Sequence, residues 1–447
     1  MKLLYIILTC VIVLSAKPRV VAYSYATDPT TTDIDFNKTT HLIASFVKSD
    51  SLGNLNFDSW VPENNIISLL RRVDSMGVVP MIALGTTASG WAMTKNQSTR
   101  ANFIKNIIAW CDSVGAKGID LDLEGTAEEF NWGSPGTFFP EPYESLAVEL
   151  RAALPDSILL TAAVGSLAHN GAQWSDKFIE QLDWINVMIY DRALTWDSSP
   201  VENHAPWNAF PLSTKYWHGN RGLEKDKILL GVPFYARGWD LDNNVIYKED
   251  AGWKDYYPED WAYNEFIDKF NLSIELDSFF LEPGETINHS RKTGIDGKAV
   301  IYFNGKQMIA RKTAWMVDSG YGGIMIWHIA ADTKTANNKS LLATIDSVIN
   351  NSTPIHKTVK PTLKDRSITA NILNNKIILT SLLPNKNYLL KLYTTNGKIL
   401  NQLNIRPNNT GTAKVSFSKN NANSIIFIEL KELSKNKNPI FIKLVNR

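Results

Sequence analysis

Cysteine is almost absent from this chain of 447 residues, which has only Cys10 and Cys111. Cys10 lies in an apolar N-terminal run, so a chain that loses this run keeps one cysteine and can form no internal disulfide. A chain of this length can rely on its apolar core instead. Cys111 lies in an apolar helical run and is predicted to be a core residue. No cluster of His and Cys supports a transition-metal site, so we expect no metal and no cofactor.

The one N-terminal run of apolar residues, Leu3 to Leu14, is short for a membrane span. Lys2 precedes it and the small residues Ser15-Ala16 follow it, which is typical of a secretory signal peptide. We therefore expect residues 1–16 to be removed. The mature protein is predicted to be secreted, either extracellular or attached to the cell surface, with no membrane span.

Net charge is also small, at +1, but it is unevenly distributed. Residues 355–447 contain 16 Lys and Arg against 3 Asp and Glu, whereas the rest of the chain contains 30 against 42. This difference predicts a domain boundary, with a proline-containing linker at 351–366. A basic patch can bind nucleic acid, but no nucleic-acid motif accompanies this one. Lysines interspersed with asparagines favour a solvated face, so no nucleic-acid partner is expected.

Short apolar runs alternate with amphipathic, helix-like stretches through the first 330 residues. This order predicts parallel strands joined by helical crossovers. Eight such runs favour an α/β fold of the (β/α)8 TIM-barrel type over 17–350. The alternative is a doubly wound sheet, which is weakened because no glycine-rich phosphate loop follows the first run. The eight runs are Val20–Tyr25, Leu42–Phe46, Val79–Leu84, Gly118–Leu123, Ile158–Val164, Ile185–Tyr190, Ile228–Phe234 and Gly322–Trp327.

The last part of the chain, 367–447, has short β-rich runs separated by turn residues such as Asn396-Gly397. It is predicted to be a small all-β sandwich domain. It contains no Trp, so a sugar-stacking surface is not expected there. Between these two parts, the stretch from about 238 to 305 is rich in Trp and Tyr. We predict an extended, aromatic-rich loop region there.

Three acids alternate with aliphatic residues in the stretch Gly118–Gly125. In a strand, Asp120, Asp122 and Glu124 share one face. Such crowding is costly, because neighbouring carboxylates repel one another, and this cost suggests a function. One carboxyl could stay protonated beside an ionised one, as general acid catalysis requires. Ligation of a hard cation is the other functional reading.

This stretch resembles the Asp-x-x-Asp-x-Asp-x-Glu signature of glycoside hydrolase family 18, the family of chitinases and endo-N-acetylglucosaminidases. Four further segments resemble motifs of that family, in the family's order, over roughly residues 18–350. They are Val20–Tyr23, Val187–Asp191, Leu230–Arg237 and Gly322–Trp327. Two positions depart from the pattern: Lys117 replaces the first acid, and Ala83 stands where the family usually has a serine.

The resemblance implies a retaining mechanism in which the acetamido group of the substrate attacks. Glu124 would be the acid and base, Asp122 would bind the acetamido N–H, Asp120 would share a proton with Asp122, and Tyr190 would bind the acetamido oxygen. The remaining expected substrate-binding residues are Tyr23, Phe46, Trp91, Met188, Asp191, Tyr235, Arg237 and Trp327.

The leading hypothesis is a secreted, monomeric enzyme that hydrolyses β-1,4-linked N-acetylglucosamine in chitin or chitooligosaccharides. Alternatives are an endo-N-acetylglucosaminidase acting on N-glycans or peptidoglycan-type glycans, a non-catalytic chitinase-like lectin, and an adhesion protein displayed through its basic tail. The tail, with Leu392–Lys398 and Ile442–Val445, faintly resembles the C-terminal sorting domain of type IX secretion, which implies secretion machinery as a partner.

Overall fold

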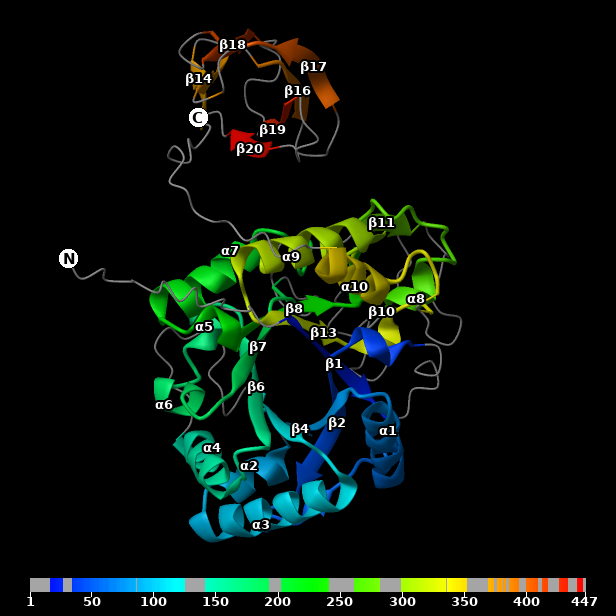
Figure 1. Ribbon diagram of the computed structural model, residues 1–447, viewed down its shortest axis with the longest axis vertical. Coiled ribbons are helices and arrows are strands. Elements are labelled where there is room, and N and C mark those ends of the chain that lie inside the picture. Colours follow the sequence, from blue (N-terminus) through cyan, green and yellow to red (C-terminus); the bar gives the residue numbers. More distant parts are fainter. Residues whose placement is uncertain are drawn as a thin grey trace, which may run out of the picture. The chain divides into compact units, whose positions relative to one another are not determined.

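Eight parallel strands form a closed barrel in the N-terminal part of the chain (Figure 1). Strand β1 pairs with β2 on one side and with β13 on the other, and this double pairing closes the sheet. An open doubly wound sheet has two edges, so that alternative is excluded and the predicted (β/α)8 barrel is confirmed. The barrel strands are β1 (Arg19–Tyr25), β2 (His41–Ser49), β4 (Val79–Gly85), β5 (Gly118–Asp122), β6 (Leu159–Gly165), β7 (Trp184–Met188), β8 (Ile228–Pro233) and β13 (Gly323–Trp327).

The structure is a computed structural model with two compact units, Met1–Pro354 and Ile355–Arg447. The described residues of the first unit are 17–26, 34–85, 87–124, 141–192, 202–240, 261–281, 299–334 and 336–351. Those of the second are 369–373, 376–380, 382, 386–393, 399–408, 412–416, 426–432 and 440–444. The predicted signal peptide, 1–16, and linker residues 352–366 lie outside them.

Helices surround the barrel, with their apolar sides against the strands (Figure 1). In α1, Ile66, Leu69, Leu70 and Val73 are buried, which is the spacing of one helix face. The helices are α1 (Glu63–Ser75), α2 (Ala88–Thr94), α3 (Gln97–Val114), α4 (Glu141–Ala153), α5 (Ala168–Gly171), α6 (Asp176–Ile179), α7 (Ala209–Thr214), α8 (Tyr263–Phe266), α9 (Lys306–Ser319) and α10 (Leu341–Asn351). Short helical turns cover Phe36–Lys38, Lys215–Asn220, Lys225–Lys227 and Ile329–Ala331.

Two layers of side chains pack on the strands. The outer layer lies between strands and helices and includes Ile119 and Leu121 of β5. The inner layer fills the barrel and includes Tyr23, Met81 and Met325. Because side chains alternate along a strand, the residues between the outward-facing aliphatics of β5 point into the barrel. The barrel interior is therefore where the acids of this strand meet side chains from the other strands.

The stretch after β8 differs from the predicted extended loop. Its described part forms an antiparallel sheet in the order β10-β9-β12-β11, with β9 (Tyr235–Asp240), β10 (Trp261–Ala262), β11 (Ser278–Leu281) and β12 (Ala299–Tyr302). The central pair, β9 and β12, joins segments about 60 residues apart, Asp240 opposite Ala299. Pairing over such a distance leaves no turn signal in the local sequence. The aromatic residues Trp253, Tyr256 and Tyr257 lie outside the described residues.

The second unit is all β in its described residues, as predicted. One sheet has the order β14-β15-β18 and the other β17-β16-β19-β20. The strands are β14 (Thr369–Leu373), β15 (Lys376–Thr380), β16 (Tyr388–Tyr393), β17 (Ile399–Ile405), β18 (Ala413–Ser416), β19 (Ile426–Glu432) and β20 (Ile440–Leu444). Leu379, Leu390 and Leu392 are buried within this unit. It therefore has apolar residues of its own to form a core.

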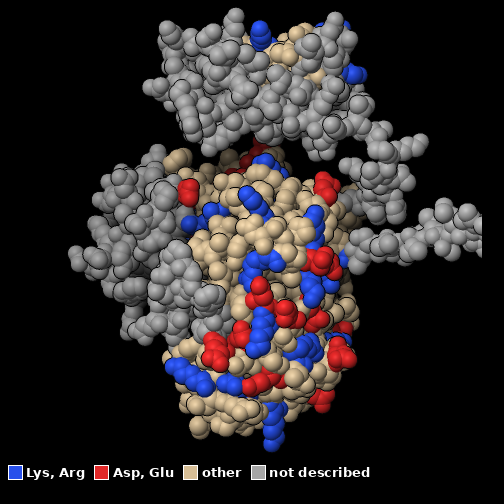
Figure 2. Space-filling view, turned by 90° about the vertical axis from the view of Figure 1, so that its left-hand side faces the viewer, with Lys and Arg blue, Asp and Glu red and all other residues tan. Residues whose placement is uncertain are grey.

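Lys and Arg are intermixed with Asp and Glu on the described face of the barrel unit seen in Figure 2. A face of this kind has no single sign to attract a highly charged polymer. None of the helices formed by the described residues combines the length and the apolar character needed to cross a membrane.

Candidate active site

Strand β5 brings the acids of the alternating stretch to the carboxyl end of the barrel. Asp120 is fully buried and Asp122 is nearly so, at 6% exposure, whereas Glu124, two residues beyond the end of β5, is exposed. In the parallel pairing, Asp120 lies opposite Ala83 of β4 and Thr161 of β6. The three acids therefore follow one line from the barrel interior to the solvent.

Three donors surround the Asp120 carboxylate. Tyr23 Oη donates over 2.6 Å, Thr161 Oγ1 over 2.5 Å and Asn186 Nδ2 over 2.9 Å. Burial raises the pKa of Asp120 to about 6, although these three hydrogen bonds lower it. Burial also raises the pKa of Tyr23 well above its usual value, helped by the charges of Asp120 and Asp122. Asp120 is thus fixed in the interior as an acceptor while Tyr23 remains a donor.

Thr161 and Asn186 were not predicted from the sequence. Ala83 leaves β4 without a hydroxyl beside Asp120, and Thr161 places one there from the strand on the other side. Trp184 Nε1 donates to Asn186 Oδ1 over 3.2 Å, which turns the amide N–H groups toward Asp120 and Tyr23. The signal for both residues was their position on a barrel strand with side chains facing inward.

Asp122 and Glu124 form a hydrogen-bonded pair of carboxyl groups. Burial raises the pKa of Asp122 well above its usual value, and the charges of Glu124 and Asp120 raise it further. For Glu124, desolvation by the surrounding protein, followed by the negative charge of Asp191, raises the pKa to about 7. Glu124 is exposed, so water also reaches it and partly screens these charges. The pair holds a shared proton near neutral pH.

Tyr190 lies two residues after the end of β7 and is half-buried. Burial and the charges of Asp122 and Glu124 raise the pKa of its phenol well above the usual value. The hydroxyl is therefore neutral over the range in which proteins are active. It lies 3.9 Å from Met325 Sδ, and the ring packs edge-on against Tyr235. Met188, the last residue of β7, packs with the same inner cluster.

Asp191 and Arg237 form a two-point ion pair next to Tyr190. Arg237 Nε donates to Asp191 Oδ1 over 2.9 Å and Nη2 to Oδ2 over 2.8 Å. Burial tends to raise the pKa of Asp191, but the charge of Arg237 and the hydrogen bonds of Arg237 and His204 hold it well below the usual range. Asp191 is therefore a permanent negative charge, and that charge acts on Glu124.

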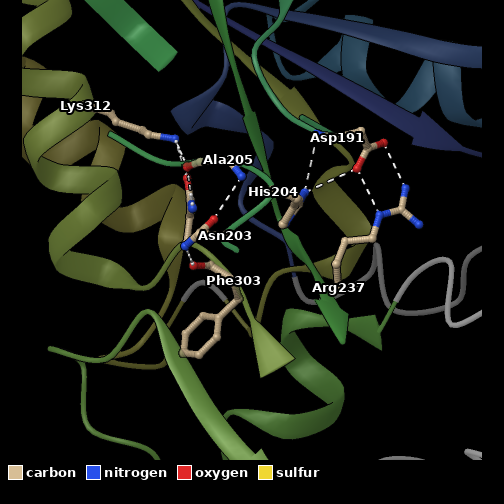
Figure 3. A network of polar contacts seen from close by, with 8 residues as sticks. Asp191, Asn203, His204, Ala205, Arg237, Phe303 and Lys312 are labelled. Atoms are coloured by element: carbon tan, nitrogen blue, oxygen red, sulfur yellow. Dashed lines mark hydrogen bonds and ion pairs between the residues drawn. The ribbon is translucent and has the colours of Figure 1, made fainter. Parts of the chain in front are cut away.

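His204 completes this group, and the sequence offered no motif for it. The side chain is fully buried, with Nδ1 3.2 Å from Asp191 Oδ1. Figure 3 shows His204 beside Asp191 and Arg237. The His204 ring lies 5.0 Å from the ring of Tyr235, which is itself buried and lies 5.2 Å from Arg237 Cζ. Tyr235 thus packs against both Arg237 and His204 from within the protein.

Aromatic rings gather around Trp327 at the end of β13. Its ring centre lies 5.5 Å from Tyr23 and 6.0 Å from Phe46, the latter in a stacked arrangement. The register of β2 shifts between Ala44 and Val47, which re-aims the segment that carries Phe46. Gly85 makes room for that ring, because a Cβ there would come within 2.9 Å of it. The structure therefore brings together Tyr23, Phe46 and Trp327 as predicted residues of one site.

Two aromatic residues extend this cluster and were missed. Tyr25 lies 5.7 Å from Trp327 and 5.1 Å from Trp60, measured between ring centres, and Trp60 is 53% exposed. The alternation that selects Tyr23 also selects Tyr25 on the same strand face, so Tyr25 could have been found. Trp60 lies in a loop before α1, where the sequence has no periodic pattern that would indicate which way its side chain points.

Two further residues singled out from the sequence are Trp91 and Lys117. Trp91 is on α2, where its ring packs 4.8 Å from Tyr143 of α4 and beneath Lys95, because the chain turns into a helix directly after β4. Its described contacts do not reach the cluster of predicted site residues. Lys117 precedes β5, at its amino end, and pairs with Asp74 at 53% exposure. It therefore lies at the opposite end of β5 from Glu124.

No group of three or more His, Cys, Asp or Glu side chains among the described residues could hold a metal ion. The arrangement of these side chains is suited to proton transfer. It offers a solvent-accessible carboxyl with a raised pKa, a buried carboxyl hydrogen bonded to it, a neutral phenol and an aromatic surface. This is the combination that general acid–base catalysis on an uncharged, ring-shaped substrate requires.

Residues 19–332 match the family model described as glycosyl hydrolases family 18. The chain is 25% identical to an endochitinase of Brugia malayi over 331 residues, which is 67% of this chain and 64% of that protein. It is 29% identical to the class V chitinase CHIT5 of Lotus japonicus over 233 residues, 48% of this chain and 58% of that one. The chain thus spans little more than half to two thirds of the length of these curated relatives.

Among solved structures, the chain resembles the GH18 chitinase ChiB from the chitin utilization locus of Flavobacterium johnsoniae. The TM-score is 0.57 at 27% identity, over 74% of this chain and 94% of that one. A chitinase from Bacteroides thetaiotaomicron has the same TM-score at 22% identity, over 76% of this chain and 99% of that one, and supports the fold alone.

Proposed function

The chain belongs to glycosyl hydrolases family 18, and from this membership we propose that it hydrolyses β-1,4-linked N-acetylglucosamine in chitin or chitooligosaccharides. The observation that carries the proposal is the line of Asp120, Asp122 and Glu124. In this line the solvent-accessible carboxyl has a pKa raised to about 7 and is hydrogen bonded to a buried one. The names of the relatives, which are chitinases, support the substrate class.

In the first step of the proposed reaction, Glu124 donates its proton to the glycosidic oxygen as the bond from that oxygen to the anomeric carbon breaks. The acetamido oxygen of the same sugar attacks the anomeric carbon and forms an oxazolinium ring. Asp122 accepts from the acetamido N–H and balances the developing positive charge. This step requires the proton of the pair to be on Glu124, so that Asp122 is ionised when it accepts from the acetamido N–H.

In the second step, water attacks the anomeric carbon, the ring reopens, and Glu124 takes the proton of the water. The product keeps the β-configuration because two displacements have occurred at one carbon. Tyr190 donates to the acetamido oxygen, which its neutral phenol can do at any pH of interest. Trp327 offers its apolar face to the sugar ring, and Arg237 and Asp191 supply polar contacts at its edge.

The first test measures hydrolysis of N-acetylchitooligosaccharides by the chain from Lys17, beside Glu124→Gln. We expect roughly a 10²- to 10⁴-fold loss of kcat in the variant, because the amide of Gln cannot act as a general acid. Proton NMR of the fresh product is expected to show the β-anomer. Glu224→Gln, which changes an exposed residue in the turn before β8, is the matched control and should retain full activity.

Other outcomes separate the alternatives. Binding of the oligosaccharide without cleavage by either protein would identify a lectin. Neither binding nor cleavage would favour N-glycans or peptidoglycan-type glycans as the substrate, on which the same residues can act. An equal rate for Glu124→Gln and the parent would exclude the proposed acid.

We also propose that the protein is exported. This rests on the N-terminal sequence, with Lys2, the apolar run to Leu14 and Ser15-Ala16. Cell fractionation and N-terminal sequencing of the mature protein test it. A mature chain beginning near Lys17 outside the cytoplasm is expected, and a cytoplasmic chain with an intact N-terminus would refute it.

A further inference from the structure

Lys312 of α9 is a fully buried lysine. Its Nζ donates to the backbone oxygen of Ala205 over 2.9 Å and to Asn304 Oδ1 over 2.5 Å, and it lies 4.6 Å from the ring centre of Phe210. In the part of the chain that the structure describes, no carboxylate forms an ion pair with it. Burial lowers the pKa of Lys312 to about 7, against the charge of Asp277. Burying an ammonium group costs free energy, so the contacts that hold Lys312 in the interior need a structural explanation.

The segment that Lys312 contacts, Asn203–Ala205, is held from two sides. On the side of α9, Asn304 Nδ2 donates to the Ala205 oxygen over 3.0 Å, and Asn203 Nδ2 donates to the Phe303 oxygen over 3.2 Å (Figure 3). On the side of β7, the backbone N–H of Arg192 donates to the His204 oxygen over 3.0 Å. The segment thus links α9 to the residues that directly follow Asp191.

Asp191 needs such support. Its φ of 53° lies in the left-handed region, which is unfavourable for a residue with a Cβ. Its carboxylate is oriented by Arg237 and by His204, whose Nδ1 lies 3.2 Å away. His204 can hold that position only if the backbone of Asn203–Ala205 stays in place. The contacts therefore run from Lys312 through Ala205 and His204 to Asp191.

We propose that Lys312 is a positioning residue that acts through the Asn203–Ala205 segment and His204 to keep Asp191 aligned with Arg237 and facing Glu124. This rests on the proposed function, because Asp191 matters there as a substrate-binding group and as the charge beside the acid. Lys312 itself lies in the protein interior and does not touch the substrate.

A double-mutant cycle tests the route. Lys312→Met keeps the alkyl stem and removes the donors, and His204→Phe keeps a ring against Tyr235 and removes the hydrogen bond to Asp191. Each single change is expected to lower kcat/KM on chitooligosaccharides about tenfold, since a small displacement of a positioned group has effects of this order. The double variant should have the same kcat/KM as His204→Phe alone, because both changes interrupt the same series of contacts.

Effects that multiply in the double variant would overturn the proposal, as would a loss in Lys312→Met that only follows the folded fraction measured by thermal unfolding. Arg311→Met, which alters the adjacent exposed cation of α9, is the matched control and should keep kcat/KM. If Lys312→Met does not fold, Lys312→Gln takes its place in the cycle, because its amide is uncharged and one bond shorter and cannot match both contacts of Nζ.

A second readout needs no substrate. The ring signals of His204 are assigned by NMR from their loss in His204→Phe, and the proposal expects them to shift in folded Lys312→Met and to stay in Arg311→Met. Unchanged His204 signals in folded Lys312→Met would overturn the positioning role whatever the enzyme cleaves. Absence of cleavage by the parent protein, with shifted His204 signals, would instead contradict only the proposed function.

Discussion

At the scale of single residues, the position of a shared proton controls the chemistry proposed here. Asp122 and Glu124 are hydrogen bonded, and Asp191 adds a fixed negative charge that favours the protonated form of Glu124. A like charge raises a carboxyl pKa because it makes ionisation less favourable. The pKa of the proposed acid thus depends on Asp191, at the end of another strand, and the charge of Asp191 depends in turn on Arg237 and His204.

The pH profile tests this arrangement. Because Glu124 must carry a proton to act as the acid, kcat/KM is expected to fall as pH rises through its pKa of about 7. Asp191→Asn removes the negative charge, lowers the pKa of Glu124 and should move this alkaline limb to lower pH. The measurement is kcat/KM against pH for both proteins, with Asp176→Asn, an exposed acid of α6, as control. A limb that stays in place or moves upward would show that Asp191 does not act on Glu124.

At the scale of elements, the residues of the proposed site lie at the ends of strands, and a residue that follows β13 caps a neighbouring helix. Asp332, which is buried, receives hydrogen bonds from the backbone N–H groups of Leu341 and Leu342 and from Ser340 Oγ at 2.8–2.9 Å. It therefore caps the first turn of α10, whose N–H groups have no partner within the helix. This links the segment that follows β13, and hence Trp327, to the helix that packs beside it.

Asp332→Ala should reduce the free energy of unfolding by roughly 2–3 kcal/mol, because buried N–H groups lose their acceptors. Asp332→Asn, which keeps one acceptor oxygen, should lose less. Chemical denaturation of the chain from Lys17, followed by circular dichroism, measures both. Asp346→Ala, which removes a surface ion pair of the same helix with Lys38, should cost under about 1 kcal/mol. An equal loss for Asp332→Ala and Asp346→Ala would refute the capping role.

At the scale of the whole molecule, the chain consists of two compact units with different charge and different architecture. The barrel unit has the proposed active site and its own cores, and the second unit buries Leu379, Leu390 and Val415 in its own sheets. The chemistry proposed here uses residues of the first unit alone. The basic second unit is a candidate for sorting or surface attachment.

Removal of the second unit should therefore separate catalysis from export. A chain of residues 17–354, purified beside 17–447, is expected to fold and to retain kcat/KM on soluble chitooligosaccharides within about twofold, the additivity expected of independent parts. In cells, a chain of residues 1–354 is expected to lose surface attachment or export. A large loss of activity in the purified shorter chain would mean that the second unit takes part in catalysis. Unchanged export and attachment would remove the sorting hypothesis.

The sequence by itself determined the barrel and much of its site, because the relevant signals are local. Period-two alternation places Asp120, Asp122 and Glu124 on one strand face, and parallel strands bring residues such as Tyr190 and Trp327 to one end of the barrel. The strand pairing in the stretch after β8 was missed, since β9 and β12 meet across about 60 residues of chain.

Only the tertiary structure decided which groups control those residues. Thr161, Asn186 and His204 reach their partners across 41, 66 and 13 positions of sequence, and Lys312 reaches Ala205 across 107. None of these contacts has a local pattern, because each depends on how strands and helices are packed. The same packing placed the Trp91 ring against Tyr143 and left Lys117 in an exposed ion pair with Asp74, for which the local sequence offers no physical signal.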